Sequence, residues 1–293
     1  AWQVTARARE PNRFGGPVRL AAPDAHRAAF EREHARFVRD RDAWAARHAG
    51  QYDPAPVALD PARFADARVL VLAPHPDDEL IGCGGLALRL EDAGARVTCI
   101  QATDGSDSHA LKDRPESERR GVRVAEACDI AAAAGFAAEF WNADNHAFRP
   151  TAELVERLAR RIADDRPRLI LTPFLTDIHP DHLTLNRILA DAIERLPDAV
   201  RDTEVLGYEV WSLAPANRVC EVTGVRERQE ALLRRYVTAM KVEDFVEFCE
   251  RRNFYEGCRM LGRPALAEAF LAAPAAAWPG WVREAAAVTS AAP

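Results

Sequence analysis

The sequence predicts an α/β protein whose sheet is mainly parallel and flanked by helices. Between residues 68 and 213, short apolar runs alternate with longer segments of helical composition. An apolar run of about four to eight residues suits a strand that is buried on both faces, as in a parallel sheet. Polar segments rich in His and Asp follow two of these runs, where a parallel sheet places its ligand-binding loops.

The alternation can be followed element by element. The first run, RVLVLAP, ends just before His75, and RLILTPF is an equally clear strand. Strands are predicted over residues 68–74, 95–103, 137–143, 168–174 and 207–213, and helices over residues 84–93, 116–134, 151–165 and 182–196. Strands and helices in this order predict crossover connections between parallel strands.

The pattern weakens beyond the fifth predicted strand. RVCEVT is a candidate for one more strand, and residues 225–240 and 243–255 have helical composition. The Ala- and Pro-rich tail is predicted to be packed by Trp278 and Trp281 and frayed beyond them. The C-terminal part of the chain is therefore predicted to be mainly helical.

The first part of the chain is predicted to form an N-terminal helical extension. Residues 1–22 are rich in Pro and Arg and are expected to be an irregular arm. Residues 23–48 repeat apolar side chains near a seven-residue interval, at Ala29, Phe30, Phe37, Val38, Trp44 and Ala45. The expected division is an arm and helix over residues 1–62, packed on the core, and a larger domain over residues 63–293. A subunit contact or a cover over the substrate is the alternative role for the extension.

Composition and charge exclude several classes of protein. Hydrophobic residues make up 48% of the 293 residues, so the chain can build a core and is not disordered overall. The formal net charge of −6 gives no support for nucleic-acid binding. No run of about 18 uncharged apolar residues is present, so no membrane span is predicted. The segment AWQVTARAREPNRF lacks a continuous apolar core and is therefore not a signal peptide.

The six cysteines are scattered along the chain, and none belongs to a C-x-x-C pair. Several of them lie inside apolar segments. This distribution predicts reduced, partly buried thiols in a cytoplasmic protein, rather than a disulfide framework or a zinc knuckle. The expected partner is a small molecule, and a homo-oligomer is compatible with the sequence.

Adjacent acids after the first strand require something to offset their repulsion. His75 is followed by Asp77, Asp78 and Glu79, and each carboxylate prefers water to the end of a buried strand. A divalent cation would favour the ionised forms of these acids. The fourth predicted strand is followed by a second cluster, HPDH, at residues 179–182. The two clusters together predict a metal site at one edge of the sheet.

The spacing within the clusters assigns roles. A hydrolytic zinc site has three protein ligands and one position for water. His75 and Asp78 are three residues apart and can be aimed at one point, and His182 can supply the third ligand from the other loop. Asp77 then points toward the water and can act as general base. His179 suits stabilisation of the oxyanion or protonation of the leaving group. Iron, cobalt or manganese can bind the same ligands as zinc.

Simpler interpretations of each motif exist. HPDD alone could be a turn with capping aspartates, and HPDH alone could cap a helix through Asp181. Two such clusters directly after strong apolar strands make coincidence a poor explanation. The stretch from Gly82 to Ala87 also fits the G-x-G-x-x-A dinucleotide fingerprint. However, eight mostly acidic or polar residues separate Ala73 from Gly82, and the acids would repel a pyrophosphate. The glycines are better explained by a helix that starts close to the metal loop.

APHPDDELIGCGG, with HPDH after a later strand, resembles the zinc-dependent N-acetylglucosaminyl deacetylases of the PIG-L/LmbE type. The resemblance covers about residues 66–215 and extends more faintly to about residue 270. It implies a Rossmann-like fold and a deacetylase catalytic domain over residues 63–293. It also implies one zinc ion per chain on His75, Asp78 and His182, with Asp77 as general base and His179 facing the tetrahedral intermediate.

The resemblance also points to residues that contact the substrate. RVAEA resembles the family's R-x-x-E-A helix, whose arginine, here Arg123, reaches the sugar; the simpler interpretation is an ion pair with Glu126. Asp144 lies in a segment resembling the loop whose aspartate holds sugar hydroxyls; the simpler interpretation is a turn-forming Asp. Asp104, in the loop after the second predicted strand, is a further candidate. Some relatives have a tyrosine two residues before the HPDH motif, where this chain has Asp177.

The leading hypothesis is hydrolysis of the N-acetyl group of an N-acetylated amino sugar or its glycoconjugate. The first alternative is metal-dependent hydrolysis of another N-acyl amide, since the shape of the pocket cannot be deduced from the sequence. The second is a non-catalytic sugar- or nucleotide-binding module, which would be expected to lack a ligand or the base. All five proposed positions are present, which favours an enzyme.

Overall fold

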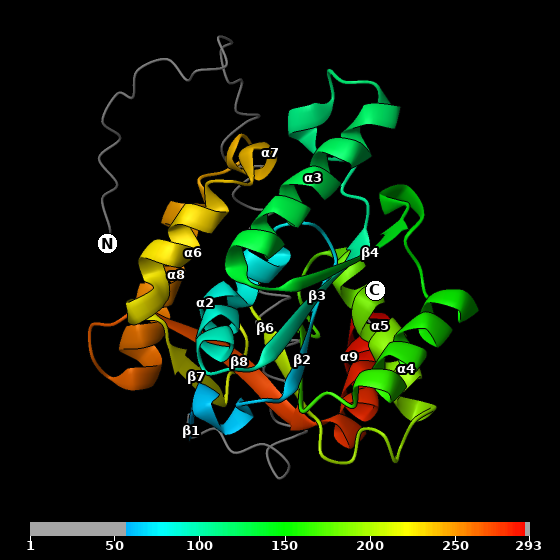
Figure 1. Ribbon diagram of the computed structural model, residues 1–293. Coiled ribbons are helices and arrows are strands. Elements are labelled where there is room, and N and C mark those ends of the chain that lie inside the picture. Colours follow the sequence, from blue (N-terminus) through cyan, green and yellow to red (C-terminus); the bar gives the residue numbers. More distant parts are fainter. Residues whose placement is uncertain (1–56, 291–293) are drawn as a thin grey trace. The chain divides into compact units, whose positions relative to one another are not determined.

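The computed structural model describes residues 57–290, and their centre is one eight-stranded mixed sheet (Figure 1). The strands lie in the order β1-β7-β8-β6-β5-β2-β3-β4. Their bounds are Val57–Ala58 (β1), Arg68–Ala73 (β2), Arg96–Thr103 (β3), Ala137–Ala143 (β4), Leu169–Pro173 (β5), Glu204–Tyr208 (β6), Arg218–Glu221 (β7) and Ala267–Pro274 (β8). All neighbouring strands are parallel except β8, which runs antiparallel to both β6 and β7. The α/β class with a mainly parallel sheet is therefore confirmed.

The order of the strands contains a switch point between β2 and β5. From β2 the chain moves outward to β3 and β4, and it then crosses back to start again at β5 and β6 on the other side. Ligand sites in doubly wound sheets lie at such a switch point, outside the carboxyl ends of the strands. The two motif loops follow β2 and β5, so the topology brings them to the same crevice.

Helices cover both faces of the sheet. Their bounds are Asp78–Asp92 (α2), Glu116–Ala134 (α3), Ala152–Asp165 (α4), Pro180–Glu194 (α5), Arg226–Leu233 (α6), Val237–Met240 (α7), Phe245–Leu261 (α8) and Trp278–Ser290 (α9). Short 3-10 turns occupy Pro61–Phe64, His109–Leu111, Asn145–Ala147, Thr223–Val225 and Ala275–Ala277. One apolar core lies under α2, α3, α6 and α8, and the other lies under α4, α5 and α9 (Figure 1).

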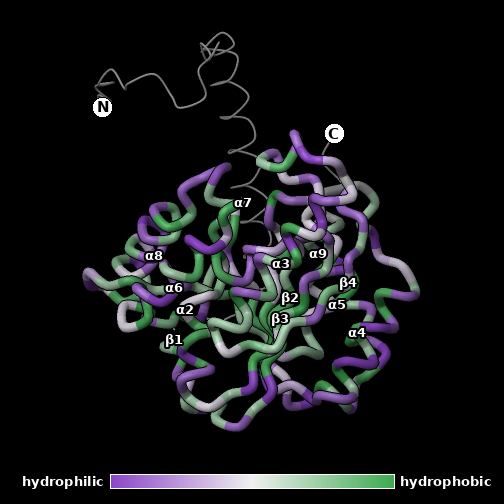
Figure 2. The backbone as a smooth tube through the Cα atoms, turned by 45° about the horizontal axis from the view of Figure 1, so that its top comes forward, coloured by the Kyte–Doolittle hydropathy of each residue, from purple (hydrophilic) through white to green (hydrophobic). Residues whose placement is uncertain are grey.

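The alternation of side chains along β2 explains the two cores. Val69 and Val71 point into the first core, and Leu70 and Leu72 point into the second. All four are fully buried, which is the pattern expected for a strand with helices on both faces. Figure 2 shows the resulting hydropathy: the tube is green along the central β2 and β3 and largely purple along the outer helix α4.

The helix α2 begins at Asp78, six residues earlier than predicted. It is interrupted at Cys83, whose φ of −147° is not helical, and the predicted helix over residues 84–93 coincides with its second segment. The buried Glu268 carboxylate accepts hydrogen bonds from the N–H groups of Gly85 and Leu86, both 2.8 Å long, and so caps that second segment. The glycines therefore lie inside the helix rather than in front of it.

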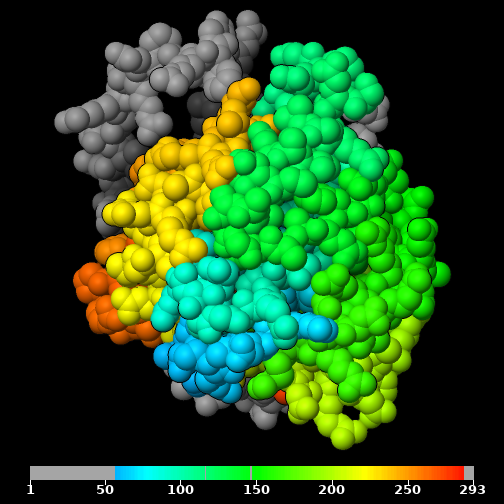
Figure 3. Space-filling model, viewed as in Figure 1, coloured from blue at the N-terminus to red at the C-terminus, as the bar shows by residue number. Residues whose placement is uncertain are grey.

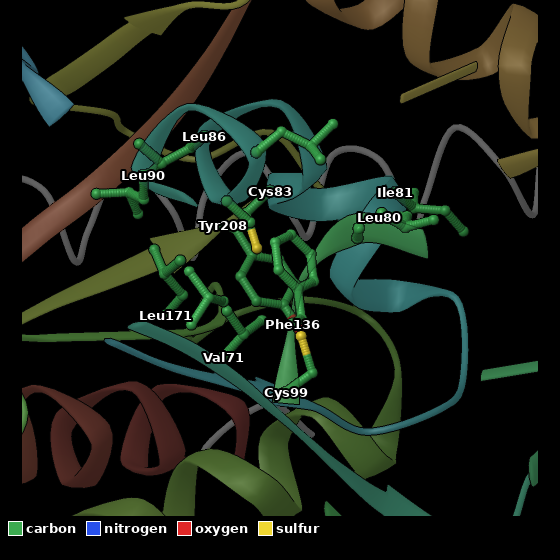
Figure 4. Close-up of a cluster of buried hydrophobic side chains, with 14 of the residues drawn as sticks. Val71, Leu80, Ile81, Cys83, Leu86, Leu90, Cys99, Phe136, Leu171 and Tyr208 are labelled. Atoms are coloured by element: carbon green, nitrogen blue, oxygen red, sulfur yellow. The ribbon is translucent and has the colours of Figure 1, made fainter. Parts of the chain in front are cut away.

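Gly82 is required by the close approach of α2 to β6. A Cβ atom at this position would lie 2.1 Å from the ring of Tyr208, which no real contact allows. Tyr208 is fully buried between α2 and the strands, near Val71 and Leu171 (Figure 4), and its hydroxyl donates to the carbonyl of Leu72. The glycine thus serves helix packing, and the dinucleotide fingerprint is not needed to explain it.

Differences between the sequence prediction and the structure concentrate in the C-terminal part. The predicted strand over residues 207–213 is β6 at Glu204–Tyr208, and the helical segment at 225–240 consists of the separate helices α6 and α7. RVCEVT does contain a strand, β7. The strand β8 was not predicted, because the Ala-rich sequence AEAFLAAP has low strand propensity and is fixed by pairing with β6 and β7. Beyond it, the tail forms α9 rather than fraying.

The remaining predictions concern the two ends of the chain, the cysteines and membrane spans. Trp278 and Trp281 are buried as expected, with exposures of 0% and 3%. The predicted arm over residues 1–22 and the predicted helix over residues 23–48 lie outside the described residues. All six cysteines lie within the described residues and are free. Among the helices of residues 57–290, none combines the length and the apolar character needed to cross a membrane.

Candidate active site

Two loops at the switch point bring the predicted residues together. We call residues 74–79, which follow β2, the first loop, and residues 174–182, which follow β5, the second loop. His75 Nε2 in the first loop lies 2.9 Å from Asp181 Oδ2 in the second. The ring centres of His75 and His179 are 4.7 Å apart, and those of His179 and His182 are 4.9 Å apart. The motifs thus form one cluster although about a hundred residues separate them.

Asp78 lies between the histidines of both loops. Its Oδ2 atom accepts a hydrogen bond of 3.0 Å from the backbone N–H of His75. The same oxygen lies 3.0 Å from Nδ1 of His75 and 3.3 Å from Nε2 of His182. Asp78 can do this because it occupies the first turn of α2, directly after the tight loop that carries His75. The two histidines predicted as ligands therefore both contact the same oxygen of the third predicted ligand, Asp78.

The two ring nitrogens of His182 lack hydrogen-bond partners among the described residues. Its side chain is fully buried, and neither ring nitrogen makes a hydrogen bond of good geometry to any described residue. Nitrogens of His75, His179 and His182 lie within 4.8 Å of one another. A buried imidazole normally satisfies both nitrogens, so this arrangement fits a cation bound by imidazole nitrogens and a carboxylate oxygen, the donor set that zinc prefers.

The electrostatics of the cluster favour positive charge. Burial by itself lowers the pKa of His75, but hydrogen bonds to Asp181 and Asp78 raise it to about 9. Burial likewise lowers the pKa of His182, while the charge of Asp78 and the contact with Asp177 raise it to about 10. Burial raises the pKa of Asp78, but the charge of His182 holds it well below its usual range. The carboxylates that attract these protons would also attract a metal cation.

Asp77 occupies a different position from Asp78. Its backbone has a φ of 123°, a conformation that side-chain-bearing residues rarely adopt. The Oδ2 atom of Asp77 accepts a hydrogen bond of 2.8 Å from Arg123. Burial raises the pKa of Asp77 to about 7, against the opposing charge of Arg123. The two neighbouring carboxylates therefore have different partners: Asp78 contacts histidines, and Asp77 contacts Arg123.

Arg123 supports the first loop from the helix α3. It is 3% exposed and also donates to the carbonyl of Pro76 and to Glu126, the latter at 3.1 Å. Its guanidinium lies 5.5 Å from the centre of the Tyr236 ring. The ion pair with Glu126 is thus present together with a link to Asp77. Arg123 also borders the cavity described below, which is where the resemblance implies a contact with sugar.

Glu79 and Tyr236 complete the support of Asp77. The Glu79 carboxylate, 3% exposed, accepts a hydrogen bond of 3.1 Å from the backbone N–H of Asp77. The hydroxyl of Tyr236, from the segment between α6 and α7, donates to the other oxygen of Glu79. Burial raises the pKa of Glu79, and burial raises the pKa of Tyr236 well above its usual value. Sequence reasoning missed Tyr236, because nothing in its local sequence points to a partner 157 residues away.

Asp177, to which the sequence assigned no role, contacts both the second loop and the segment after β6. One of its oxygens accepts a hydrogen bond from the backbone N–H of His179 and lies 3.4 Å from His182 Nδ1. The other accepts from the backbone N–H of Trp211 at 3.0 Å. A carboxylate behind a ligating histidine is a common way to orient the ring. Its position two residues before the HPDH motif was the sequence feature that could have pointed to a role in the site.

Asp104 and Asp144 do not border the cavity. The Asp104 carboxylate accepts a hydrogen bond from the backbone N–H of Ser106, and its own N–H donates to Ala143, so it shapes the loop after β3. Asp144 is exposed in the loop after β4, and its carbonyl accepts from Ala147. The neighbouring Asn145 borders the cavity instead and donates to Asp181 Oδ2 at 3.4 Å.

A cavity of about 400 Å³ lies beside the histidines, a size typical of small-molecule sites. It has one polar and one apolar wall. The polar wall and floor consist of His75, Asp77, Asp78, Gly105, Asp107, Ser108, His109, Arg123, Asn145 and His179. The apolar wall consists of Trp211, Ala239, Val242 and Phe245. On the molecular surface shown in Figure 3, the yellow residues around α6 and α7 adjoin the green residues of α3.

Fold and cluster together define a class: an α/β protein with a His/Asp centre at the carboxyl edge of a Rossmann-like sheet. Residues 70–193, which include both loops, match the family model described as "PIG-L: GlcNAc-PI de-N-acetylase". This segment of the chain is therefore similar to the PIG-L family, which is the resemblance that the motifs indicated.

Curated relatives support the same family. The chain is 27% identical over 216 residues to a 1D-myo-inositol 2-acetamido-2-deoxy-alpha-D-glucopyranoside deacetylase of Thermobispora bispora, covering 62% of this chain and 66% of that one. It is 28% identical over 160 residues to a diacetylchitobiose deacetylase of Thermococcus kodakarensis, covering 50% of this chain and 57% of that one. In both cases the match spans less than two thirds of the relative's length.

Solved structures share the fold at low sequence identity. An N,N'-diacetylchitobiose deacetylase from Pyrococcus horikoshii superposes with a TM-score of 0.63 at 20% identity, covering 80% of this chain and 92% of that one. GalB, the 4-carboxy-2-hydroxymuconate hydratase of Pseudomonas putida KT2440, superposes with a TM-score of 0.60 at 19% identity, covering 70% of this chain and 95% of that one. Because a hydratase shares the fold, the fold alone does not identify the reaction.

Proposed function

We propose that this chain is a metal-dependent hydrolase that removes the N-acetyl group from an N-acetylated amino sugar or its glycoconjugate. The observation that carries the proposal is the convergence on one cavity of both motif loops, which lie in the segment that matches the PIG-L family model. The relatives named as deacetylases support this reaction. The products would be acetate and a free amine.

His75, Asp78 and His182 are the residues proposed to hold the cation, with zinc as the metal expected for this donor set. A divalent cation bound there would polarise the amide carbonyl and make a water molecule more acidic. Asp177 orients the ring of His182 from behind. His179 is the third histidine of the same cluster.

Asp77 is proposed as the general base. It borders the cavity next to the ligand cluster, and one of its oxygens is engaged by Arg123. Its other oxygen can then take the proton of the attacking water. Arg123 and Glu79 hold Asp77 in its unusual backbone conformation, so the carboxylate does not have to reorganise during the reaction.

His179 is proposed to stabilise the tetrahedral intermediate. Its Nδ1 accepts a hydrogen bond of 3.2 Å from the backbone N–H of Asp181, so the neutral ring carries its proton on Nε2. Nε2 can donate to the oxygen that develops negative charge when the amide carbonyl is attacked. Burial and the charges of His75 and His182 lower the pKa of His179, which favours this neutral form.

The test is metal content and acetate release, measured on one purified sample with a panel of N-acetylated amino sugars. We expect about one zinc per chain and a loss of acetate release on chelation. The Asp77→Asn variant should keep its metal and lose about 10²- to 10⁴-fold in kcat. Asp113→Asn, an exposed acid remote from the cluster in the loop after β3, serves as the matched control.

Two outcomes would contradict the proposal. Full acetate release by the Asp77→Asn variant would remove Asp77 from the role of base. Bound metal with no acetate from any sugar would favour the hydrolysis of another N-acyl amide.

A further inference from the structure

We infer that the substrate carries an apolar group, alkyl or aryl, next to the N-acetylated sugar, and that Trp211, Val242 and Phe245 select it. The inference rests on the proposed function, because it concerns the same cavity. It comes from the apolar wall, which the proposed chemistry does not use.

The apolar wall has no partner for sugar hydroxyls. Trp211, Ala239, Val242 and Phe245 border the cavity, and only the indole N–H among their side chains can form a hydrogen bond. Hydroxyl groups placed against this wall would lose hydrogen bonds to water without replacing them. The polar part of the lining offers Asp107, Ser108, His109 and Asn145, which suit a sugar. A ligand that satisfies both walls is therefore polar on one side and apolar on the other.

Two of the four residues of the apolar wall are exposed to an extent that is unusual for large apolar side chains, whereas Ala239 and Phe245 are buried. Trp211 is 44% exposed and Val242 is 54% exposed. Two further exposed apolar residues, Leu213 at 39% and Val237 at 53%, lie two positions along the chain from residues of the wall. Isolated exposed apolar residues need no explanation, but exposed apolar side chains that line a pocket indicate a binding surface.

The wall is also held in place. The Trp211 ring lies 6.0 Å from the rings of both Phe245 and Phe248, which themselves are 6.1 Å apart. The Trp211 backbone N–H donates to Asp177, which lies behind His182. The Trp211 backbone is therefore linked to the second loop, and its ring packs against two aromatic rings of α8. A preorganised aromatic surface of this kind binds an apolar group at low entropic cost.

The experiment compares the methyl and hexyl glycosides of N-acetylglucosamine. In the intact protein, kcat/KM for the hexyl glycoside should exceed that for the methyl glycoside by at least about tenfold. Trp211→Ala should reduce this ratio to about threefold or less, and Val242→Thr, which keeps the shape of the side chain, should reduce it less. Phe254→Ser changes an exposed aromatic residue on α8 that does not border the cavity and should leave the ratio unchanged.

Binding is measured separately from turnover. Calorimetric titration of the Asp77→Asn variant with both glycosides should show the same preference for hexyl, and this preference should be lost when Trp211→Ala is added. Tight hexyl binding without acetate release would support the inference and contradict the proposed deacetylation. Equal acetate release and equal affinity for both glycosides would overturn the inference and leave the proposed function intact.

Two other results would also overturn it. An equal loss of kcat/KM for both glycosides in Trp211→Ala would mean that the indole stacks on the sugar ring itself. Unchanged ratios together with a lower Tm in both Trp211→Ala and Val242→Thr would mean that another segment of this chain covers the wall.

Discussion

The first and second loops lie at the same edge of the sheet, but they are stabilised in different ways. In the first loop, Asp77 is held by Arg123 and Glu79, and Glu79 in turn is held by Tyr236, at sequence separations of 46, 2 and 157 residues. In the second loop, Asp177 accepts from the N–H of His179, and His179 accepts from the N–H of Asp181, both two residues away.

The difference follows from the backbone. Asp77 has a φ of 123°, and such a conformation persists only when the surroundings determine it strongly. The second loop instead leads into α5 with His179 at the N-cap and Pro180 in the first turn, an arrangement that local hydrogen bonds can sustain. We therefore expect remote substitutions to affect the first loop and its base, whereas the second loop should respond mainly to changes within itself.

The largest effect is expected from the histidines of the second loop. His182→Ala removes a fully buried proposed ligand and should lower the metal content from about one per chain to near zero. His179→Ala should keep the metal and lose about 10²- to 10³-fold in kcat, because it removes a donor to the oxyanion. Metal analysis of both variants, made in parallel, checks this. Loss of metal from His179→Ala would instead make His179 a ligand.

Asp177→Asn tests the support of the second loop. In Asp177, one oxygen accepts from the N–H of His179 and contacts His182 Nδ1, and the other accepts from the N–H of Trp211. The amide of Asn has one acceptor oxygen and one donor nitrogen, so it cannot accept from both N–H groups. We expect metal affinity to fall about 10- to 100-fold, measured by competition with a chelator. Unchanged affinity would show that Asp177 shapes the loop without orienting the ring of His182.

Tyr236→Phe tests the remote support of the first loop. It removes only the hydroxyl that donates to Glu79, and the buried carboxylate loses a partner, which should cost about 1–3 kcal/mol of stability. We also expect kcat to fall about tenfold with metal content unchanged, because Asp77 is less firmly placed. Urea denaturation and steady-state kinetics measure the two effects.

Tyr208→Phe is the matched control for this prediction. Tyr208 is as deeply buried as Tyr236, but its hydroxyl donates to the carbonyl of Leu72 and touches neither loop. It should lose stability while kcat stays near that of the parent protein. A similar fall in kcat in both variants would mean that general loosening of the core, rather than the support of Asp77, explains the result.

The same contrast explains what could be predicted from the sequence. HPDH and HPDDE were recognisable because residue types and short spacings carry the chemistry, and the strong strands β2 and β5 indicate where both loops must lie. Tyr236 and the hydrogen bond from Trp211 to Asp177 depend on tertiary contacts that no local pattern encodes. The strand β8 was missed for the same reason, since its Ala-rich segment becomes a strand only between β6 and β7.

The smallest expected effect concerns the segment that follows β6. This segment contains Trp211, whose backbone N–H donates to Asp177 in the second loop. Here burial and the charge of Glu256 raise the pKa of Glu209 to about 8, against the opposing charges of Arg252 and Arg259. The folded protein therefore holds a proton on Glu209 that the unfolded chain releases near pH 4.5. Protons bind more tightly to the folded state, so the free energy of unfolding should fall as the pH rises from about 4.5 to 8.

Because Glu209 and Glu256 share this buried environment, we expect a decrease on the order of 1 kcal/mol across that range rather than the larger value that an isolated group would give. Glu209→Gln should flatten this part of the stability curve, measured by urea denaturation at several pH values, and Glu227→Gln on the surface of α6 should leave it unchanged. If the slope of Glu209→Gln matches that of the parent protein, another buried acid is responsible. If Glu209→Gln also weakens metal binding, the second loop depends on this segment more than its local hydrogen bonds indicate.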